Sequence, residues 1–185
     1  GGLDSLIGVI DILHNLNINE KILLVSHFDS NSVGPNSDQV ALHEILSKNF
    51  ADKVYWIQST VTLDRKDSNG TYLELEDSYR SRSLLFMGIA IYMFNDLIQT
   101  TELIIPENGT ISLNYPLTPS RVSSLSTRTT HPYVLTLIQK LITNVIKNIS
   151  VTNPYSLKTK GEMVLGCLDH AVLNLTYPRS VSCGK

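Results

Sequence analysis

The fold is decided by residues 1–27, GGLDSLIGVIDILHNLNINEKILLVSH, where a glycine pair leads into an amphipathic segment and then a short apolar run. Apolar residues recur at spacings of three and four, which predicts a helix from Asp4 to about Leu16. The run Lys21–Ser26 (KILLVS) is mostly apolar, as strands are when both faces of a parallel sheet are covered. A helix followed at once by a buried strand indicates an α/β fold.

The rest of the chain continues this alternation of strands and helices. The pattern predicts a single domain over residues 1–185, with a parallel sheet that carries helices on both faces. The polar run 64–70 is predicted to turn, and residues 106–130 are predicted to form a loop of a length that indicates either a function or disorder. The further helices are expected at 37–48, starting from a Ser37 cap, and at 80–98, 132–148 and 159–169, and the further strands at 54–63 and 102–105.

Composition places the chain among ordinary globular proteins. Its formal net charge of -2 gives no reason to expect non-specific binding to nucleic acid or to a membrane surface. No stretch reaches the roughly 18 apolar residues of a membrane span. Two cysteines, Cys167 and Cys183, cannot form a disulfide framework, so a reducing, cytoplasmic setting is expected. The chain starts without methionine and stops soon after a cysteine, so further residues are expected at both ends.

The glycine pair ahead of the first helix suits a site for an anion. Without a Cβ, Gly1 and Gly2 let a ligand approach the backbone closely. Free N–H groups and the helix dipole favour a pyrophosphate there. Ser5 can add a hydroxyl donor, and Asp4 could hold a magnesium ion shared with the phosphates. The alternative is a plain turn followed by a helix cap.

This GG-x-DS element resembles the S-G-G-x-D-S motif of PP-loop ATP pyrophosphatases, with the leading serine absent from the chain. Ser26-His27 ends a strand where such enzymes hold the adenosine end of ATP. Three later segments resemble the 7-cyano-7-deazaguanine synthase-like (QueC-like) branch of that superfamily. They are Arg80–Phe86 (RSRSLLF), Thr159–Glu162 (TKGE) and Ser182-Cys183, while residues 106–132 are similar to the QatC-type proteins of bacterial defence operons.

The resemblance implies a Rossmann-like PP-loop fold and an ATP-dependent ligase with ATP and Mg²⁺ as cofactors. A carboxylate of the 7-deazaguanine type would be adenylated with release of pyrophosphate, and an amine would then displace AMP. The acceptor would be ammonia or a partner protein, with defence-operon proteins as further partners. Asp4, Arg82 and Lys160 are the implied catalytic residues, and the implied nucleotide-binding residues are Gly1, Gly2, Leu3, Asp4, Ser5, Ser26 and His27.

The chain departs from the synthase pattern at the zinc cluster, which uses four cysteines. Only Cys183 lies in the corresponding region, and one thiolate cannot make a structural zinc site. Zinc binding therefore needs ligands beyond Lys185, or is lost here. Cys167 lies in an apolar helical context, which is typical of a core residue.

The loop 106–130 and the residue after it supply the predicted substrate-binding side chains, Glu107, Asn108, Arg121, Arg128 and His131. Guanidinium groups suit a carboxylate or a phosphate because they bond such groups bidentately. Arg82 and Lys160 each lie in a first helical turn, where the helix dipole is unfavourable for a cation unless an anion is bound. The alternatives are solvated loop residues, a turn at Glu107–Gly109, and a helix cap at His131.

Two rival functions remain. One is another PP-loop enzyme that acts on tRNA, although the near-neutral charge argues against direct contact with nucleic acid. The other is a defence-complex subunit that binds nucleotide without catalysis. No Walker G-x-x-x-x-G-K-S/T and no G-x-G-x-x-G occurs in the sequence, which argues against those two nucleotide sites.

Overall fold

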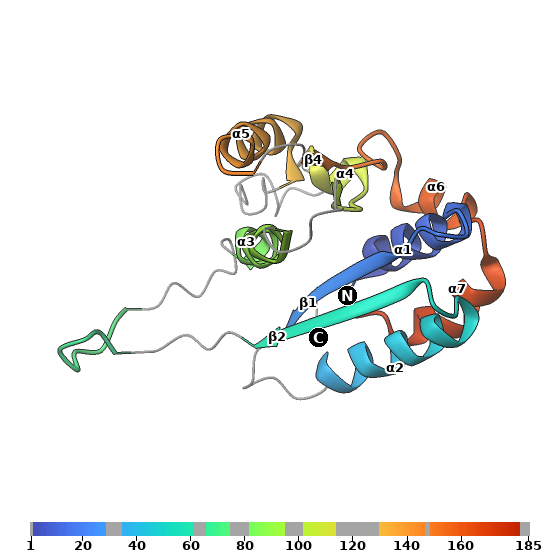
Figure 1. The fold of residues 1–185 in the computed structure, drawn as a ribbon, viewed down its shortest axis with the longest axis horizontal. Helices are drawn as coiled ribbons and strands as arrows, with labels where there is room; N and C mark the ends of the chain where they lie inside the picture. Colours follow the sequence, from blue (N-terminus) through green and yellow to red (C-terminus); the bar gives the residue numbers. More distant parts are fainter. Residues whose placement is uncertain are drawn as a thin grey trace, which may run out of the picture.

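A computed structural model describes residues 2–28, 35–60, 66–74, 82–94, 102–113, 130–146 and 149–181. It shows a mixed α/β protein with two parallel two-stranded sheets (Figure 1). One sheet pairs β1 (Ile22–Phe28) with β2 (Val54–Thr60), and the other pairs β3 (Glu102–Ile104) with β4 (Ser150–Thr152). Within these residues no helix is long and apolar enough to cross a membrane.

Helix α1 (Leu3–Asn15) buries the apolar stripe that its sequence predicts. Leu6, Ile7, Ile10 and Leu13 are each at most 5% exposed. Gly2 is the N-cap residue and has no side chain with which to cap the helix. In the second turn of the helix, the ring of Pro106 lies against Gly8. It occupies the space that a Cβ would need, so close packing requires glycine at this position.

The β1–β2 sheet is a βαβ unit, since α2 (Pro35–Asn49) connects its strands. Neighbouring residues of a strand face opposite sides, and both sides of β1 meet a helix. On one side the ring of Trp56 packs against His43 of α2, and its Nε1 donates to Ser26 Oγ at 2.7 Å. On the other side His27 meets Phe86 of α3 (Arg82–Phe94) edge to face.

The main apolar core lies between four helices and the first part of this sheet. It joins α1 and α2 to α6 (Lys160–Leu165) and α7 (His170–Thr176), with Met163 1% exposed at its centre. Asp11 of α1 ties the last part of the chain to this core. One of its oxygens accepts from the hydroxyl of Tyr155 at 2.6 Å, and the other accepts from Leu168 N at 2.8 Å.

The β3–β4 sheet lies beside α4 (Gly109–Ser112) and α5 (Pro132–Thr143). In Figure 1 this group is separate from the four-helix core and meets it near the start of α1. Gly109 closes the contact between the groups, since a Cβ there would collide with the backbone of Ser156. Its own N–H donates to Lys158 O at 2.7 Å.

Several elements differ from the sequence prediction. Helix α2 begins at Pro35, so Ser37 lies inside the helix instead of capping it. The helix expected at 159–169 ends at the C-cap Gly166, and a separate helix α7 starts after Asp169, whose side chain caps Val172 N. Strand β4 was not predicted, and α5 ends at Thr143, before the expected 148.

The expectation of one parallel sheet is met only in part, because the described strands form two sheets. The predicted polar turn is present at residues 66–72, where Asp67 Oδ1 accepts from the backbone N–H groups of Asn69 and Thr71.

Candidate functional site

Asp4, in the first turn of α1, is the centre of a polar cluster. The residue is 7% exposed. Its Oδ2 accepts two hydrogen bonds from Asn108, from the backbone N at 3.0 Å and from Nδ2 at 2.5 Å. Its Oδ1 is buried and accepts no hydrogen bond from any described residue. That oxygen faces the ammonium of Lys160 at 3.2 Å, as an ion pair without hydrogen-bond geometry.

Asn108 is 2% exposed and uses its side chain in two directions. While Nδ2 donates to Asp4, Oδ1 accepts from Ile111 N at 3.2 Å and so caps α4. Residues 107–109 therefore do not form the isolated turn that was the alternative prediction. They lead into the start of helix α4. This cap fixes the amide, and the fixed amide holds the Asp4 carboxylate.

Lys160 reaches Asp4 because a capping box sets the start of α6. Thr159 Oγ1 accepts from Glu162 N at 3.3 Å, and Glu162 Oε2 accepts from Thr159 N at 2.7 Å. Lys160 is the first residue inside the helix, and its side chain is 40% exposed. The sequence predicts a bound anion near a cation at this position. In the structure, the group that lies next to the Lys160 ammonium is the protein's own Asp4 carboxylate.

Glu107 completes the cluster beside Asp4 and Lys160. Its Oε2 accepts a short hydrogen bond from the hydroxyl of Thr130. Burial and, to a smaller extent, the negative charge of Asp4 raise the pKa of Glu107, while Thr130 and Lys160 oppose that change. The carboxyl is therefore easier to protonate than an exposed one.

Asn153 holds the backbone of Glu107 in place. Its Nδ2 donates to Glu107 O at 2.8 Å, and its Oδ1 accepts from the N–H groups of Glu107 at 3.3 Å and Tyr155 at 3.0 Å. Sequence reasoning missed both Asn153 and Thr130. The Asn-Pro pair at 153–154 marks a turn, but nothing in it indicates which backbone the amide would bind.

The start of α1 has no side-chain cap among the described residues. Gly2 provides no side-chain cap, and the first N–H groups of a helix have no intrahelical partner. A Cβ on Gly2 would meet nothing closer than Val181 O at 3.8 Å, which is an ordinary contact. The packing of the described residues therefore does not require glycine at position 2. Leu3 and Ser5 lie in the same first turn.

Ser26 and His27 are engaged within the fold. Ser26 Oγ accepts from the indole of Trp56, and His27 O accepts from Gln39 Nε2 at 3.1 Å. His131 is the N-cap of α5, with Nδ1 accepting from Tyr133 N at 3.2 Å, as the cap alternative expected. The roles proposed for these three residues in binding ligands stay predictions.

Several predicted residues lie outside the described part. These are Gly1, Arg121, Arg128 and Cys183, together with the side chain of Arg82. Cys167 is 5% exposed and belongs to the apolar core, which confirms its structural interpretation. Within the described residues no three His, Cys, Asp or Glu side chains gather to hold a metal ion.

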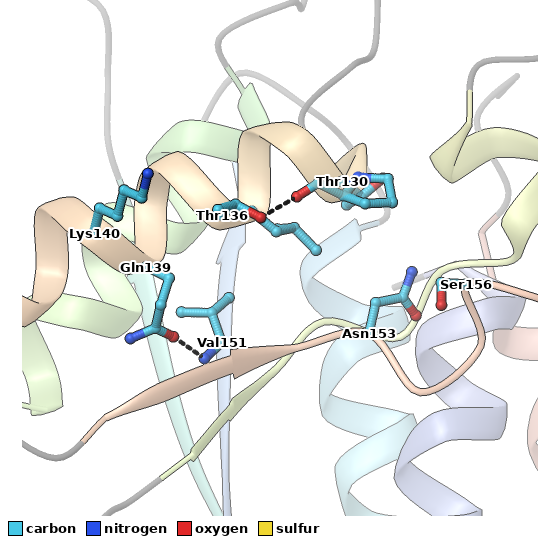
Figure 2. Close-up of a pocket in the computed structure, with 9 residues that line it drawn as sticks. Thr130, Thr136, Gln139, Lys140, Val151, Asn153 and Ser156 are labelled. Atoms are coloured by element: carbon cyan, nitrogen blue, oxygen red, sulfur yellow. Dashed lines mark hydrogen bonds between the residues drawn. The ribbon is translucent and has the colours of Figure 1, made fainter.

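A groove borders the cluster on the side of Thr130 and Asn153. It lies between α5, β4 and the turn that follows β4, with a volume of about 480 Å³ (Figure 2). The same two residues that contact Glu107 form part of its wall.

Comparisons with protein-family models, with curated proteins and with solved structures found no match for this chain.

Proposed function

We propose that this chain is the nucleotide-binding domain of a PP-loop, QueC-like ligase, which uses ATP to activate a carboxylate and transfers the acyl group to an amine. One observation carries the proposal. Asp4, Glu107, Asn108 and Lys160 were singled out in three distant segments of the sequence, and they lie together at the start of α1. The GG-x-DS resemblance supplies the nature of the nucleotide.

The start of α1 is the proposed pyrophosphate site. Its free N–H groups and its dipole favour an anion there. A glycine at position 2 that packing does not require supports a close approach of a ligand to the backbone. The side chain of Lys160 is 40% exposed, so it can turn from Asp4 toward a phosphate without crossing the core.

The residues at this site fit Mg²⁺ in one respect. Asp4 Oδ1 is a buried carboxylate oxygen without a hydrogen bond from the described residues, and Glu107 lies beside it. Mg²⁺ is commonly held by one or two carboxylates together with substrate phosphates, and it neutralises phosphate charge. Asp4 and Glu107 would hold the ion, while Asn108 keeps the Asp4 carboxylate oriented.

The proposed reaction has two steps. A carboxylate oxygen attacks the α-phosphorus of ATP, the bond to the bridging oxygen breaks, and pyrophosphate leaves with that electron pair. An amine nitrogen then attacks the acyl carbon, loses a proton, and AMP leaves as an amide forms. Lys160 and the N–H groups of α1 act by holding the departing pyrophosphate, where fixed positive charge stabilises it. The 7-deazaguanine-type acid, the ammonia or protein acceptor and the setting in phage defence rest on the resemblance alone.

The test compares two glycines whose replacement the fold tolerates. Gly2→Ala adds a Cβ with no close contact, and Gly88→Ala in α3 adds one with nothing within 4 Å. We expect Gly2→Ala to weaken the binding of Mg·ATP about tenfold or more, because a methyl group would stand between backbone and phosphate. Gly88→Ala is expected to bind as the parent does. Titration calorimetry measures both.

Turnover is measured separately, as pyrophosphate released from ATP in the presence of a panel of deazapurine carboxylates and hydroxylamine. Lys160→Met should lower the rate about 10-fold to 100-fold, while Lys158→Met, which removes an exposed lysine near Tyr155, should not. Tight binding of Mg·ATP without pyrophosphate release would favour the non-catalytic subunit. Parent-like binding in Gly2→Ala would refute the pyrophosphate site.

A further inference from the structure

The groove beside α5 is lined mainly by apolar surface. Its apolar lining residues are Leu135 of α5, Val151 of β4, and Pro132 at the start of the helix. Figure 2 shows α5 above the groove, with Asn153 and Ser156 at the end nearer the turn. Its volume of about 480 Å³ lies within the range of about 300–1,000 Å³ that is typical of small-molecule sites.

The edge of β4 that faces α5 has its backbone groups satisfied. Gln139 Nε2 donates to Ile149 O at 2.6 Å, and Gln139 Oε1 accepts from Val151 N at 2.7 Å. One side-chain amide thus takes the place of a neighbouring strand. An extended peptide that adds a strand needs these same groups, so the groove does not suit that class of ligand.

Two residues that line the groove carry polar groups that bond to no side chain of the described residues. The ammonium of Lys140 makes no hydrogen bond or ion pair with any described residue, and it is the one charged group among the described residues of the lining. The hydroxyl of Ser156 likewise makes no side-chain hydrogen bond within the described part. By contrast, Thr136, Gln139 and Asn153 all bond to backbone groups of the protein.

We propose that this groove binds a small organic anion, with its apolar body against Leu135 and Val151 and its acidic group on Lys140. An apolar floor with few polar groups is the usual construction of a small-molecule site, and those polar groups set the orientation of the ligand. Among the described lining residues Lys140 is a cation without an acidic neighbour, which selects an anion over a neutral or cationic ligand of the same shape.

The opposite end of the ligand would lie beside the polar cluster. Thr130 and Asn153 line the groove and also contact Glu107, so one layer of side chains separates the two sites. The inference does not rest on the proposed function, since it needs neither ATP nor Mg²⁺. If ATP binding failed its test, the anion site would still stand on its own measurements.

The experiment uses 2-naphthoate as the probe and 2-naphthamide as its neutral counterpart. Affinity is measured by titration calorimetry on the full chain, and the site is located by backbone amide shifts in NMR spectra. We expect 2-naphthoate to bind about fivefold more tightly than the amide, which is the scale of one partly exposed charge pair. The shifts should centre on residues 135, 151 and 156.

Three variants separate the roles of charge and shape. Lys140→Met keeps the apolar stem and should abolish the preference for the acid, and Lys140→Arg should restore it. Lys48→Met, which removes a lysine in the last turn of α2, should leave the affinities within twofold. Thr136→Trp, at an exposed helix position, should fill the groove and remove binding of both probes. Equal affinity for acid and amide, or unchanged binding in Thr136→Trp, overturns the proposal.

Discussion

The two parallel sheets of this protein are surrounded by different chemistry. Around β1 and β2, the buried apolar side chains of α1, α2, α6 and α7 form one cluster. Around β3 and β4, several of the buried side chains are polar, and each of these is bonded to a neighbouring segment. Asn108 bonds to Asp4, Ser112 to Thr130 O at 2.8 Å, and Thr130 to Glu107.

The two regions therefore have different roles: the apolar region supports the fold, and the polar region places individual atoms of the candidate site. Apolar contacts are non-directional, so the first region holds α1 firmly without fixing one atom against another. Hydrogen bonds have preferred distances and angles, so the second region sets where the carboxylates of Asp4 and Glu107 stand. The candidate site lies where the two regions meet, because Asp4 belongs to α1 and its two donors belong to Asn108.

The largest effect should come from the apolar region. Met163→Ala removes a side chain that is 1% exposed at the centre of the core, and we expect a loss of about 3 kcal/mol in the free energy of unfolding. Leu165→Ala is the matched control, because Leu165 lies in the same helix and is 80% exposed. Urea denaturation of both variants gives the difference.

If the two substitutions cost the same, α6 is not anchored through Met163 and the comparison of regions fails. If Met163→Ala also lowers the affinity for Mg·ATP in native conditions, the apolar region helps to position the atoms of the candidate site. We expect that affinity to stay unchanged in the folded protein.

What the sequence could predict follows the same division. The stripe of Leu6, Ile10 and Leu13 is periodic, so burial of one face of α1 was predictable and is confirmed. The capping box from Thr159 to Glu162 is a local pattern of four residues, and it too is confirmed. Both signals are contained in a short window of sequence.

The sequence predicted some residues of the polar cluster but not the contacts between them. Asp4, Glu107, Asn108 and Lys160 were each singled out, but no pattern indicated that Asn108 bonds Asp4 across 104 positions. Asn153 and Thr130 were missed because their partners are a backbone and a carboxyl from distant segments. Strand β4 is as short as β3, but its residues Ser150–Thr152 lack the apolar run that marked residues 103–105 as a strand.

A smaller and more local effect should come from the polar region. Asn153→Ala removes three hydrogen bonds, two of them to the backbone of Glu107. We expect the free energy of unfolding to fall by about 1–2 kcal/mol, since the backbone groups left behind are partly buried. Amide hydrogen exchange should quicken at residues 107–113 and stay unchanged in α1 and α7.

Asn174→Ala provides the matched control, because Asn174 is exposed on α7. Uniform acceleration of exchange over the whole chain in Asn153→Ala would contradict the idea that this residue acts on one region. Such a result would mean that Asn153, like Met163, stabilises the whole fold.

The smallest effect should appear as a pH dependence at Glu107. Burial raises the pKa of this carboxyl in the folded protein, so folding favours its protonated form. Its contribution to stability is therefore fully present below the unfolded value, which is 4.5, and is lost as pH rises through the raised folded value. Glu107→Gln should remove this dependence, and the variant should gain stability relative to the parent as pH rises from 4 toward neutral. The gain should be less than about 1 kcal/mol, because partial exposure to solvent screens the charge. Urea midpoints measured from pH 4 to pH 7, beside those of Glu74→Gln at an exposed position, test this. A variant that instead loses stability relative to the parent as pH rises would mean that the attraction of the Lys160 charge, and not burial, dominates the energetics of Glu107.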